Sequence, residues 1–301
     1  MKSFLSAVLI LISFTVFSQD YVDLAKGHYA NTPVNQFDSA TSGTRVQEFG
    51  LDVILPIELK SKNYFLTGFY VEGISANVTP ENSNLSSVYT TNLKLGMQFF
   101  YGDKWEATYM LLPKLSSDFK AIGGKDFQLG AVVLFKFKKK ANFNYKFGMY
   151  YNNELFGPFF VPILGLYYQS PNKKFETNLN LPLSADANYS LYSWFRVGLN
   201  FSAFVRTYHL NEPYQGNSDN YLAKTTNEIY GYLQFHATKS ILIQTMVGYS
   251  IGRNYRIYDI EDRVTWGLSA FKFGDDRDQL NTDFSDGMIL KAKLIYRFNK
   301  N

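Results

Sequence analysis

Apolar and polar residues alternate along much of this chain, in runs of about 9 to 14 residues. In FRVGLNFSAFVRTY, residues 195–208, Val197 and Leu199 occupy alternate positions, and Arg196 and Asn200 fall between them. A β-strand points successive side chains to opposite faces, so this period of two gives one apolar and one polar face. Soluble strands cluster at 5–6 residues, whereas a tilted strand crosses a bilayer in about 9–11. The runs therefore predict membrane-spanning strands.

The same alternation recurs and predicts about fourteen strands. Twelve is the alternative, because the first strand and residues 186–193 have the weakest patterns. No window after residue 19 approaches the ~18 consecutive apolar residues of a helical membrane span. The predicted strands cover residues 21–32, 44–58, 63–77, 87–101, 104–117, 126–138, 141–153, 159–170, 173–183, 186–193, 195–209, 226–237, 240–256 and 286–298.

Short and long polar connections alternate between these strands. Short turns such as 60–63 and 101–104 contrast with longer segments at 78–87, 210–224 and 258–287. Transmembrane barrels have short periplasmic turns and longer external loops. In lipid every backbone group must bond within the protein, so strands can span only as a closed barrel. The sequence thus predicts an all-β fold, one transmembrane antiparallel up-and-down β-barrel over residues 20–301.

Two further features fit a barrel in a membrane. Aromatic residues make up 18% of the chain, and Trp105 and Trp194 stand beside predicted short turns, where an interfacial aromatic girdle would lie. The alternative is a soluble β-sandwich, which also alternates but has one face on a core. The length of the runs and the rhythm of the connections favour the barrel.

The N-terminus predicts export from the cytoplasm. Lys2 precedes an apolar run at residues 4–17, and Ser18-Gln19 follow it. This is the layout of a cleaved secretory signal, which we place at residues 1–19. We therefore expect the mature chain in the outer membrane of a Gram-negative cell.

Composition excludes several classes of function. The chain has no cysteine, which excludes thiolate metal sites, disulfides and a cysteine nucleophile. A net charge of +4 without a clustered basic face does not indicate a nucleic-acid partner. The expected partners are outer-membrane lipid and, during biogenesis, the barrel-assembly machinery; the solute is unknown.

The mature chain resembles the outer-membrane β-barrel proteins of Bacteroidota, including a family of unknown function. The resemblance lies in the signal ending Phe17-Ser18-Gln19, the segments 179–183 (LNLPL) and 189–192 (YSLY), and the closing strand 294–298 (LIYRF). It implies a location and a fold rather than an activity. A terminal aromatic residue resembles the signal that barrel-assembly machinery reads, although residues 299–301 follow Phe298 here.

Polar residues on the opposite side from the apolar set are the candidate lining of a lumen. Rings of basic residues can favour anions in a pore. The same cations can instead pair with Glu106, Glu176 or other acids, and both alternatives stay open. The candidates are Lys94, Gln98, Lys136, Lys146, Arg196, Asn200, Arg206, Gln244, Lys291, Lys293 and Arg297.

Catalytic and metal-binding patterns are weak, and we expect no catalytic residue, metal or cofactor. Residues 248–252 read G-x-S-x-G, but they lie inside an alternating strand rather than at a strand-to-helix turn. Of the three histidines, His28, His209 and His236, none is a persuasive base, and His209 shares the parity of the apolar Val205. The acidic residues at 275–286 lack the spacing of a calcium loop.

These observations favour a porin-like passive channel for small solutes. Barrels of 16–18 strands leave aqueous channels and eight-stranded ones are filled, so fourteen is intermediate. The segment 258–287 could fold into the mouth. A non-channel surface, structural or adhesion barrel acting through its loops is the first alternative, and a lumen packed with bulky polar groups would favour it. A barrel hydrolase is the second. A channel for hydrophobic substrates is a variant that a lateral opening would favour.

Overall fold

The computed structural model describes residues 21–38, 41–80, 86–212, 214 and 219–299. The predicted signal segment, residues 1–19, lies outside the described residues. Within those ranges, no helix is long and apolar enough to cross a membrane.

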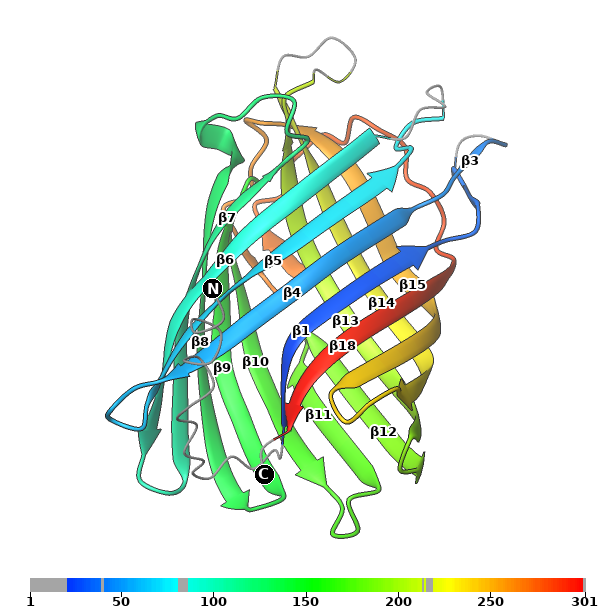
Figure 1. Cartoon of the computed structure of the whole chain (residues 1–301). Coiled ribbons are helices and arrows are strands. Elements are labelled where there is room, and N and C mark those ends of the chain that lie inside the picture. Colours follow the sequence, from blue (N-terminus) through cyan, green and yellow to red (C-terminus); the bar gives the residue numbers. More distant parts are fainter. Residues whose placement is uncertain (1–20, 39–40, 81–85, 213, 215–218, 300–301) are drawn as a thin grey trace, which may run out of the picture.

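Fourteen antiparallel strands close into one barrel (Figure 1), which confirms the predicted fold and strand number. One hydrogen-bonded sheet holds sixteen strands, of which β16 and β17 branch from β10 and leave fourteen in the ring. The ring strands are β1 (Tyr21–Asn31), β4 (Gln47–Glu58), β5 (Tyr64–Ala76), β6 (Ser86–Tyr101), β7 (Trp105–Ser117), β8 (Phe127–Lys140), β9 (Phe143–Glu154), β10 (Gly157–Gln169), β11 (Phe175–Leu181), β12 (Ser184–Tyr192), β13 (Phe195–Leu210), β14 (Asn220–His236), β15 (Ile241–Asp259) and β18 (Met288–Asn299).

The two ends of the barrel differ in their connections. The first ring strand begins beside the end of the last, because Tyr21 pairs with Asn299. The connections at this same end, which we call the turn end, are short, and the longer connections lie at the opposite loop end, together with the two-residue connections 155–156 and 182–183 (Figure 1). The predicted alternation of short and long connections is therefore present except along β9 to β12.

Strand boundaries differ from the prediction mainly at the loop end. β14 begins at Asn220 instead of 226, and β15 runs to Asp259 instead of 256. Asn220 and Lys224 give this segment the composition of a loop, but both are buried in the packed loop end and pair with β15. The predicted polar segment 210–224 is therefore strand at Leu210 and from Asn220 onward.

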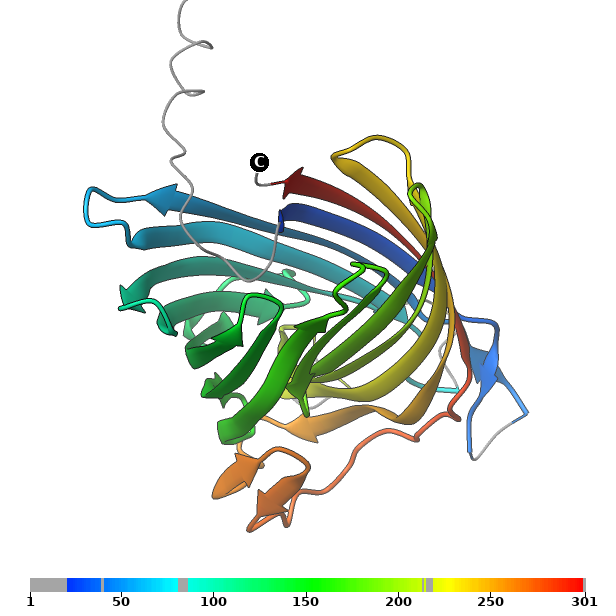
Figure 2. The ribbon, with the colours of Figure 1, turned by 90° about the horizontal axis from the view of Figure 1, so that it is seen from below.

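The longer connections contain short hairpins of their own. β2 (Asn35–Gln36) pairs with β3 (Gly43–Thr44), and β16 (Trp266–Leu268) pairs with β17 (Phe271–Phe273). β16 also pairs in parallel with β10, and Figure 2 shows the orange hairpin beside the wall. A third connection carries the 3₁₀ turn η1 (Gly124–Asp126).

The outer surface of the wall is apolar. Large hydrophobic side chains at alternate positions are exposed on most ring strands, such as Leu93 and Leu95 on β6. Trp105 and Trp194 are exposed at the turn end, where Trp194 stacks on Tyr192 with ring centroids 5.8 Å apart. A barrel in lipid requires this arrangement of an apolar band with aromatic residues at its edge.

Two neighbouring strands are much shorter than the rest. β11 has 7 residues and β12 has 9, whereas the other ring strands have 11 to 19. The β11–β12 hairpin therefore ends well below the loop end of the barrel, between β10 and β13 (Figure 1).

Candidate functional site

The inward side of the strands carries all eleven candidate lining residues. On β13, Asn200 is half-buried, while its neighbour Leu199 is 64% exposed on the outer surface. Each of the other ten is likewise buried or half-buried, and apolar neighbours such as Leu93, Phe147 and Leu294 are exposed. Alternation thus separates the two faces as the sequence indicates, and the role of these residues in lining an open lumen stays a prediction.

Most of the inward cations are paired with acids. Lys136 Nζ lies 2.7 Å from Glu106 Oε1, and Arg196 Nη1 lies 3.9 Å from Glu176 Oε2. The sequence left these pairings open as the alternative to an anion-attracting ring. Among the candidate lining residues the pairs are Lys94–Asp52, Lys136–Glu106, Arg196–Glu176, Arg206–Glu72, Lys291–Glu228 and Arg297–Asp23. Much of the interior charge is therefore neutralised, which weakens the argument for anion preference.

The remaining candidates contact inward polar groups on nearby strands. Lys146 donates to the side chains of Asn178 and Asn180 on β11. Gln98 donates to Glu106, Gln244 to Gln234 at 2.8 Å, and Asn200 to Asp186 at 3.1 Å. Lys293 stands opposite His28 in one adjacent strand and Gln244 in the other.

The middle of the interior contains solvent space. Phe204 on β13 shares the inward side with Arg206 but is 41% exposed. On β4 the inward side chain of Asp52 is 38% exposed. Because both side chains point inward, their exposed surfaces border a space enclosed by the wall. We call this level of the interior the middle lumen.

Buried ion pairs link opposite walls above the middle lumen. Glu72 on β5 pairs with Arg206 on β13 and accepts a hydrogen bond from Tyr208 Oη at 2.7 Å. Glu48 on β4 lies 2.6 Å from Lys224 Nζ on β14. Neither glutamate is among the lining residues predicted from the sequence. Each stands on the inward side of a predicted strand, and that parity is the signal that identifies them.

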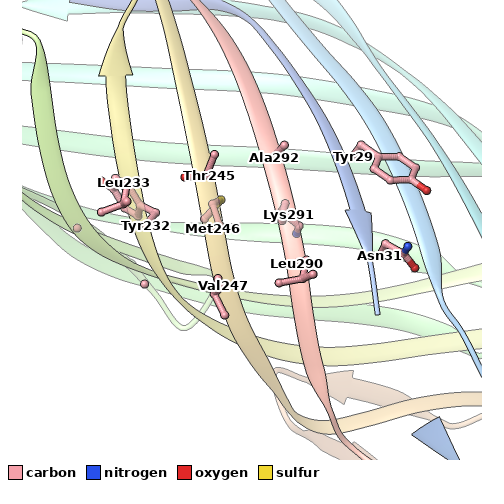
Figure 3. A pocket seen from close by; sticks show the side chains of 12 residues that line it. Tyr29, Asn31, Tyr232, Leu233, Thr245, Met246, Val247, Leu290, Lys291 and Ala292 are labelled. Atoms are coloured by element: carbon pink, nitrogen blue, oxygen red, sulfur yellow. The ribbon is translucent and has the colours of Figure 1, made fainter. Parts of the chain in front are cut away.

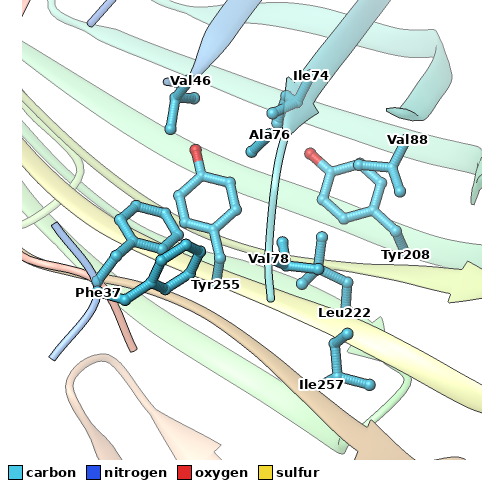
Figure 4. Close-up of a cluster of buried hydrophobic side chains, with 11 residues drawn as sticks. Phe37, Val46, Ile74, Ala76, Val78, Val88, Tyr208, Leu222, Tyr255 and Ile257 are labelled. Carbon is cyan, nitrogen blue, oxygen red and sulfur yellow. The ribbon is translucent and has the colours of Figure 1, made fainter. Parts of the chain in front are cut away.

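An apolar cluster fills the loop end above these ion pairs (Figure 4). Its side chains come from both sides of the ring and from the external connections. We call this cluster the outer plug. It consists of Phe37, Val46, Ile74, Ala76, Val78, Val88, Tyr208, Leu222, Tyr255, Ile257 and Phe284.

The segment between β17 and β18 contributes to the outer plug. The ring of Phe284 packs edge-on against Phe37, with centroids 6.0 Å apart. The Asn281 side chain donates to the carbonyl of Tyr255 at 2.8 Å and accepts from the amide of Ile257 at 2.7 Å. The segment 258–287 thus folds into the mouth, as the sequence allowed.

β13 also closes the loop end by leaving the wall. Beyond the top of β12, its His209 pairs in parallel with Ser117 of β7. Ser116 Oγ donates to the carbonyl of Thr207 at 2.8 Å, and Glu154 accepts from the Thr207 amide at 2.8 Å. Opposite walls therefore meet, and the loop end is packed.

A polar contact crosses the interior at the turn end. Tyr21 Oη on β1 donates to Glu176 on β11. Five ring strands separate β1 from β11, so this bond joins opposite walls. The turn end is therefore narrowed by polar side chains, whereas the loop end is closed by apolar ones.

His209 lies in a different place from the predicted one. Its parity with Val205 predicts a lipid-facing side chain, but it is buried because β13 has left the wall. Its Nδ1 lies 2.7 Å from Asp126 Oδ1, and its Nε2 lies 3.3 Å from Asp219 Oδ1. Hydrogen bonds from Lys125 and His209 hold the pKa of Asp219 below its usual value. Both ring nitrogens face carboxylates rather than a hydroxyl nucleophile, so the arrangement does not resemble a nucleophile–base pair.

The other catalytic and metal-binding candidates have structural contacts. Ser250 is buried within β15 and bonds to the backbone of Gly287. His28 Nε2 lies 3.1 Å from Glu48, and His236 contacts Gln234. Across the described ranges, no three metal-ligating side chains are grouped to hold an ion. Within the acidic segment, Asp275 pairs with Arg277 and Asp283 with Arg256.

A groove of about 680 Å³ lies on β1, β13, β14, β15 and β18 (Figure 3). Exposed Tyr29, Leu233, Val247 and Leu290 surround the smaller Gly231. These side chains belong to the apolar outer surface. The lining also includes the buried residues Tyr232, Met246 and Lys291, which belong to the inward side.

The comparisons with solved structures concern the fold alone. The chain is similar to an outer-membrane channel from Pseudomonas putida F1, at 7% identity and a TM-score of 0.45, over 92% of this chain and 96% of that one. It is also similar to a deletion mutant of the TodX monoaromatic hydrocarbon channel, at 10% identity and a TM-score of 0.40, over 94% of this chain and 91% of that one. The NanC porin is similar at 10% identity and a TM-score of 0.33, over 91% of this chain and 98% of that one.

One family model matches most of the sequence. No curated protein matches the chain. A family model described as a domain of unknown function, DUF6268, matches residues 17–268. The predicted Bacteroidota origin stays a prediction. Because the model covers most of the chain, the protein belongs to the DUF6268 family.

Proposed function

We propose that this protein is a passive channel for small molecules in the outer membrane. The observation that carries the proposal is the middle lumen, where inward side chains such as Phe204 and Asp52 keep exposed surface inside a closed wall. A wall that is apolar outside and polar inside supports insertion in lipid around a water-accessible interior. Export through the predicted signal and insertion by the barrel-assembly machinery are part of this proposal.

The proposed lining consists of the eleven inward candidates, with Asp52 and Phe204 added at the middle level. Most of the cations have acidic partners, so the proposed interior is polar but without strong selectivity for one sign of charge. The outer plug leaves the loop end packed, so the route of a solute is not a straight path along the barrel axis.

A liposome-swelling assay tests this function. Vesicles containing the refolded barrel are expected to swell faster than protein-free vesicles in isosmotic solutions of small neutral solutes, with a size limit set by the packed ends. Heat-modifiable migration on a gel serves as the control for folding. A folded barrel that never changes the swelling rate for any solute contradicts the channel proposal.

A non-channel surface or structural barrel is the second candidate. The packed loop end and the Tyr21–Glu176 bond across the turn end favour it. In that case the external connections bind a partner and the interior serves only stability. The two candidates are separated by the same assay, because only a channel changes the swelling rate.

A further inference from the structure

The barrel wall has a gap in its strand pairing above the short β11–β12 hairpin. β10 pairs with β11 only as far as Leu164, and β13 pairs with β12 only as far as Ser202. Above this level, β10 next pairs with β16, at Phe159 and Phe160. Within the part of the chain that the structure describes, residues 161–163 and 203–206 thus have no strand between them. We call this place the wall window.

Apart from Arg206, the side chains around the wall window are apolar. Val161 belongs to a buried cluster, and Leu183 and Val205 pack against that cluster. One backbone hydrogen bond crosses the lower border, from the Ala203 amide to the Leu183 carbonyl at 2.9 Å. The border residues are Val161, Ile163, Leu183, Ala203, Phe204 and Val205, and above them Arg206, whose charge is paired with Glu72. Opening the window therefore requires displaced apolar side chains rather than a broken ladder of backbone hydrogen bonds.

Apolar surface is exposed on both sides of the wall window. Leu164 and Leu181 are exposed on the outer surface, next to its lower border. On the inner side, Phe204 borders the middle lumen. The two ends of the barrel differ, because one is packed and the other is crossed by polar side chains. The window therefore has exposed apolar side chains on its outer side and toward the middle lumen, while Val161 and Ile163 within it are buried.

The upper border of the wall window is formed by a loop rather than by a ring strand. The amides of Val264 and Ser269 donate to the carbonyls of Phe156 and Phe160, each at 2.8 Å. These two bonds and the short β10–β16 pairing attach the β16–β17 hairpin to the wall. Val264 also packs with Phe156 and Val161 in one buried cluster. A shift of this border would displace these side chains and these few bonds, but no pairing between ring strands.

We infer that the wall window is a lateral route by which small apolar molecules pass between the outer leaflet and the middle lumen. This inference rests on the proposed channel function and names its class of solute. A polar molecule would lose its hydration among these side chains without gaining hydrogen-bond partners, whereas an apolar molecule would not. The lining therefore selects apolar cargo.

Substitutions at Phe204 test the route, because this side chain is exposed and its replacement does not leave a cavity in a packed core. The probe is 1-N-phenylnaphthylamine, whose fluorescence rises when it enters an apolar phase, added to intact Gram-negative cells that express the full chain. Wild type is expected to take up the probe faster than cells without the protein. Phe204→Asp is expected to lower the protein-dependent rate at least about five-fold, because a charge then stands in the apolar passage. Phe204→Leu is the matched control and keeps the rate within about two-fold, because it stays apolar.

The outcomes separate the route from the channel function. Equal uptake by wild type, Phe204→Asp and Phe204→Leu overturns the window while uptake itself still supports a channel. No protein-dependent uptake of the probe, together with liposome swelling in small polar solutes, also overturns the window and leaves the channel. If neither the probe nor polar solutes pass, both proposals fail. Should Phe204→Asp not reach the membrane, Phe204→Ser tests the same point with an uncharged polar group.

Discussion

Single-channel conductance is expected to rise about ten-fold when the outer plug is loosened by the double substitution Asn281→Ala and Phe284→Ala. Asn281 bonds to the backbone of Tyr255 and Ile257, and Phe284 packs between the rings of Phe37 and Tyr255. Without these contacts the segment no longer holds its place in the mouth, and water can enter a constriction that apolar side chains keep dry. Recordings in planar bilayers measure the change.

Phe271→Ala is the control for this experiment. Phe271 lies in the same connection, on β17, but it is 68% exposed and outside the outer plug. Its replacement is expected to leave the conductance unchanged. A double variant that folds normally and conducts like wild type would show that the plug does not close the barrel.

The second large effect is a loss of stability when Glu72 is replaced. This buried carboxylate pairs with Arg206 and accepts hydrogen bonds from Tyr70 Oη at 2.5 Å and Tyr208 Oη at 2.7 Å. Glu72→Ala leaves Arg206 buried without its partner. Breaking a buried pair from one side typically costs about 3–5 kcal/mol, and we expect a fall of that size in the free energy of unfolding. Denaturant unfolding in lipid vesicles, followed by tryptophan fluorescence, measures it.

Two controls isolate the effect of burial at Glu72. Glu212→Ala breaks the exposed Lys120–Glu212 pair, whose side chains are 66% and 73% exposed, and should cost less than about 1 kcal/mol. Glu72→Ala combined with Arg206→Met removes both charges and should recover much of the loss. A change below about 1 kcal/mol for Glu72→Ala alone contradicts the structural role of the ion-pair layer.

The fold was predictable because a barrel in lipid imposes one pattern on every strand. Period-two alternation in β6 or β13 reports directly which side chains face out, since Leu93 and Leu199 must meet an apolar phase. The rhythm of short and long connections then orders the strands around the ring. Neither signal depends on contacts between distant parts of the sequence.

The packed loop end was less predictable, because it does depend on contacts between distant parts of the sequence. There β13 leaves the wall and meets β7, so parity no longer separates lipid from interior, and His209 is buried although its position predicts exposure. The outer plug joins residues as distant in sequence as Phe37 and Phe284. Alternation within a single strand carries no information about such contacts.

The interior was predictable in its residues but not in its pairings. The lysine and arginine positions follow from parity, whereas the partner of each depends on which walls approach. Arg206 meets Glu72 because the interior narrows above the middle lumen, and the two residues are far apart in sequence. The short β11–β12 hairpin, which leaves the wall window above it, turns at 182–183, two residues before the turn at 184–185 that the predicted strand boundaries give.

Labelling of single cysteines tests most directly that the polar face borders a water-filled interior within a membrane-spanning wall. The chain has no cysteine, so Asn200→Cys and Leu199→Cys each give one thiol, on opposite faces of adjacent residues. In lipid vesicles, a charged methanethiosulfonate reagent is expected to modify the thiol at 200 and to leave the thiol at 199 unmodified. Modification at 199 but not at 200 would contradict the account. Absence of modification at both positions would also contradict it, because the interior would then be closed to water.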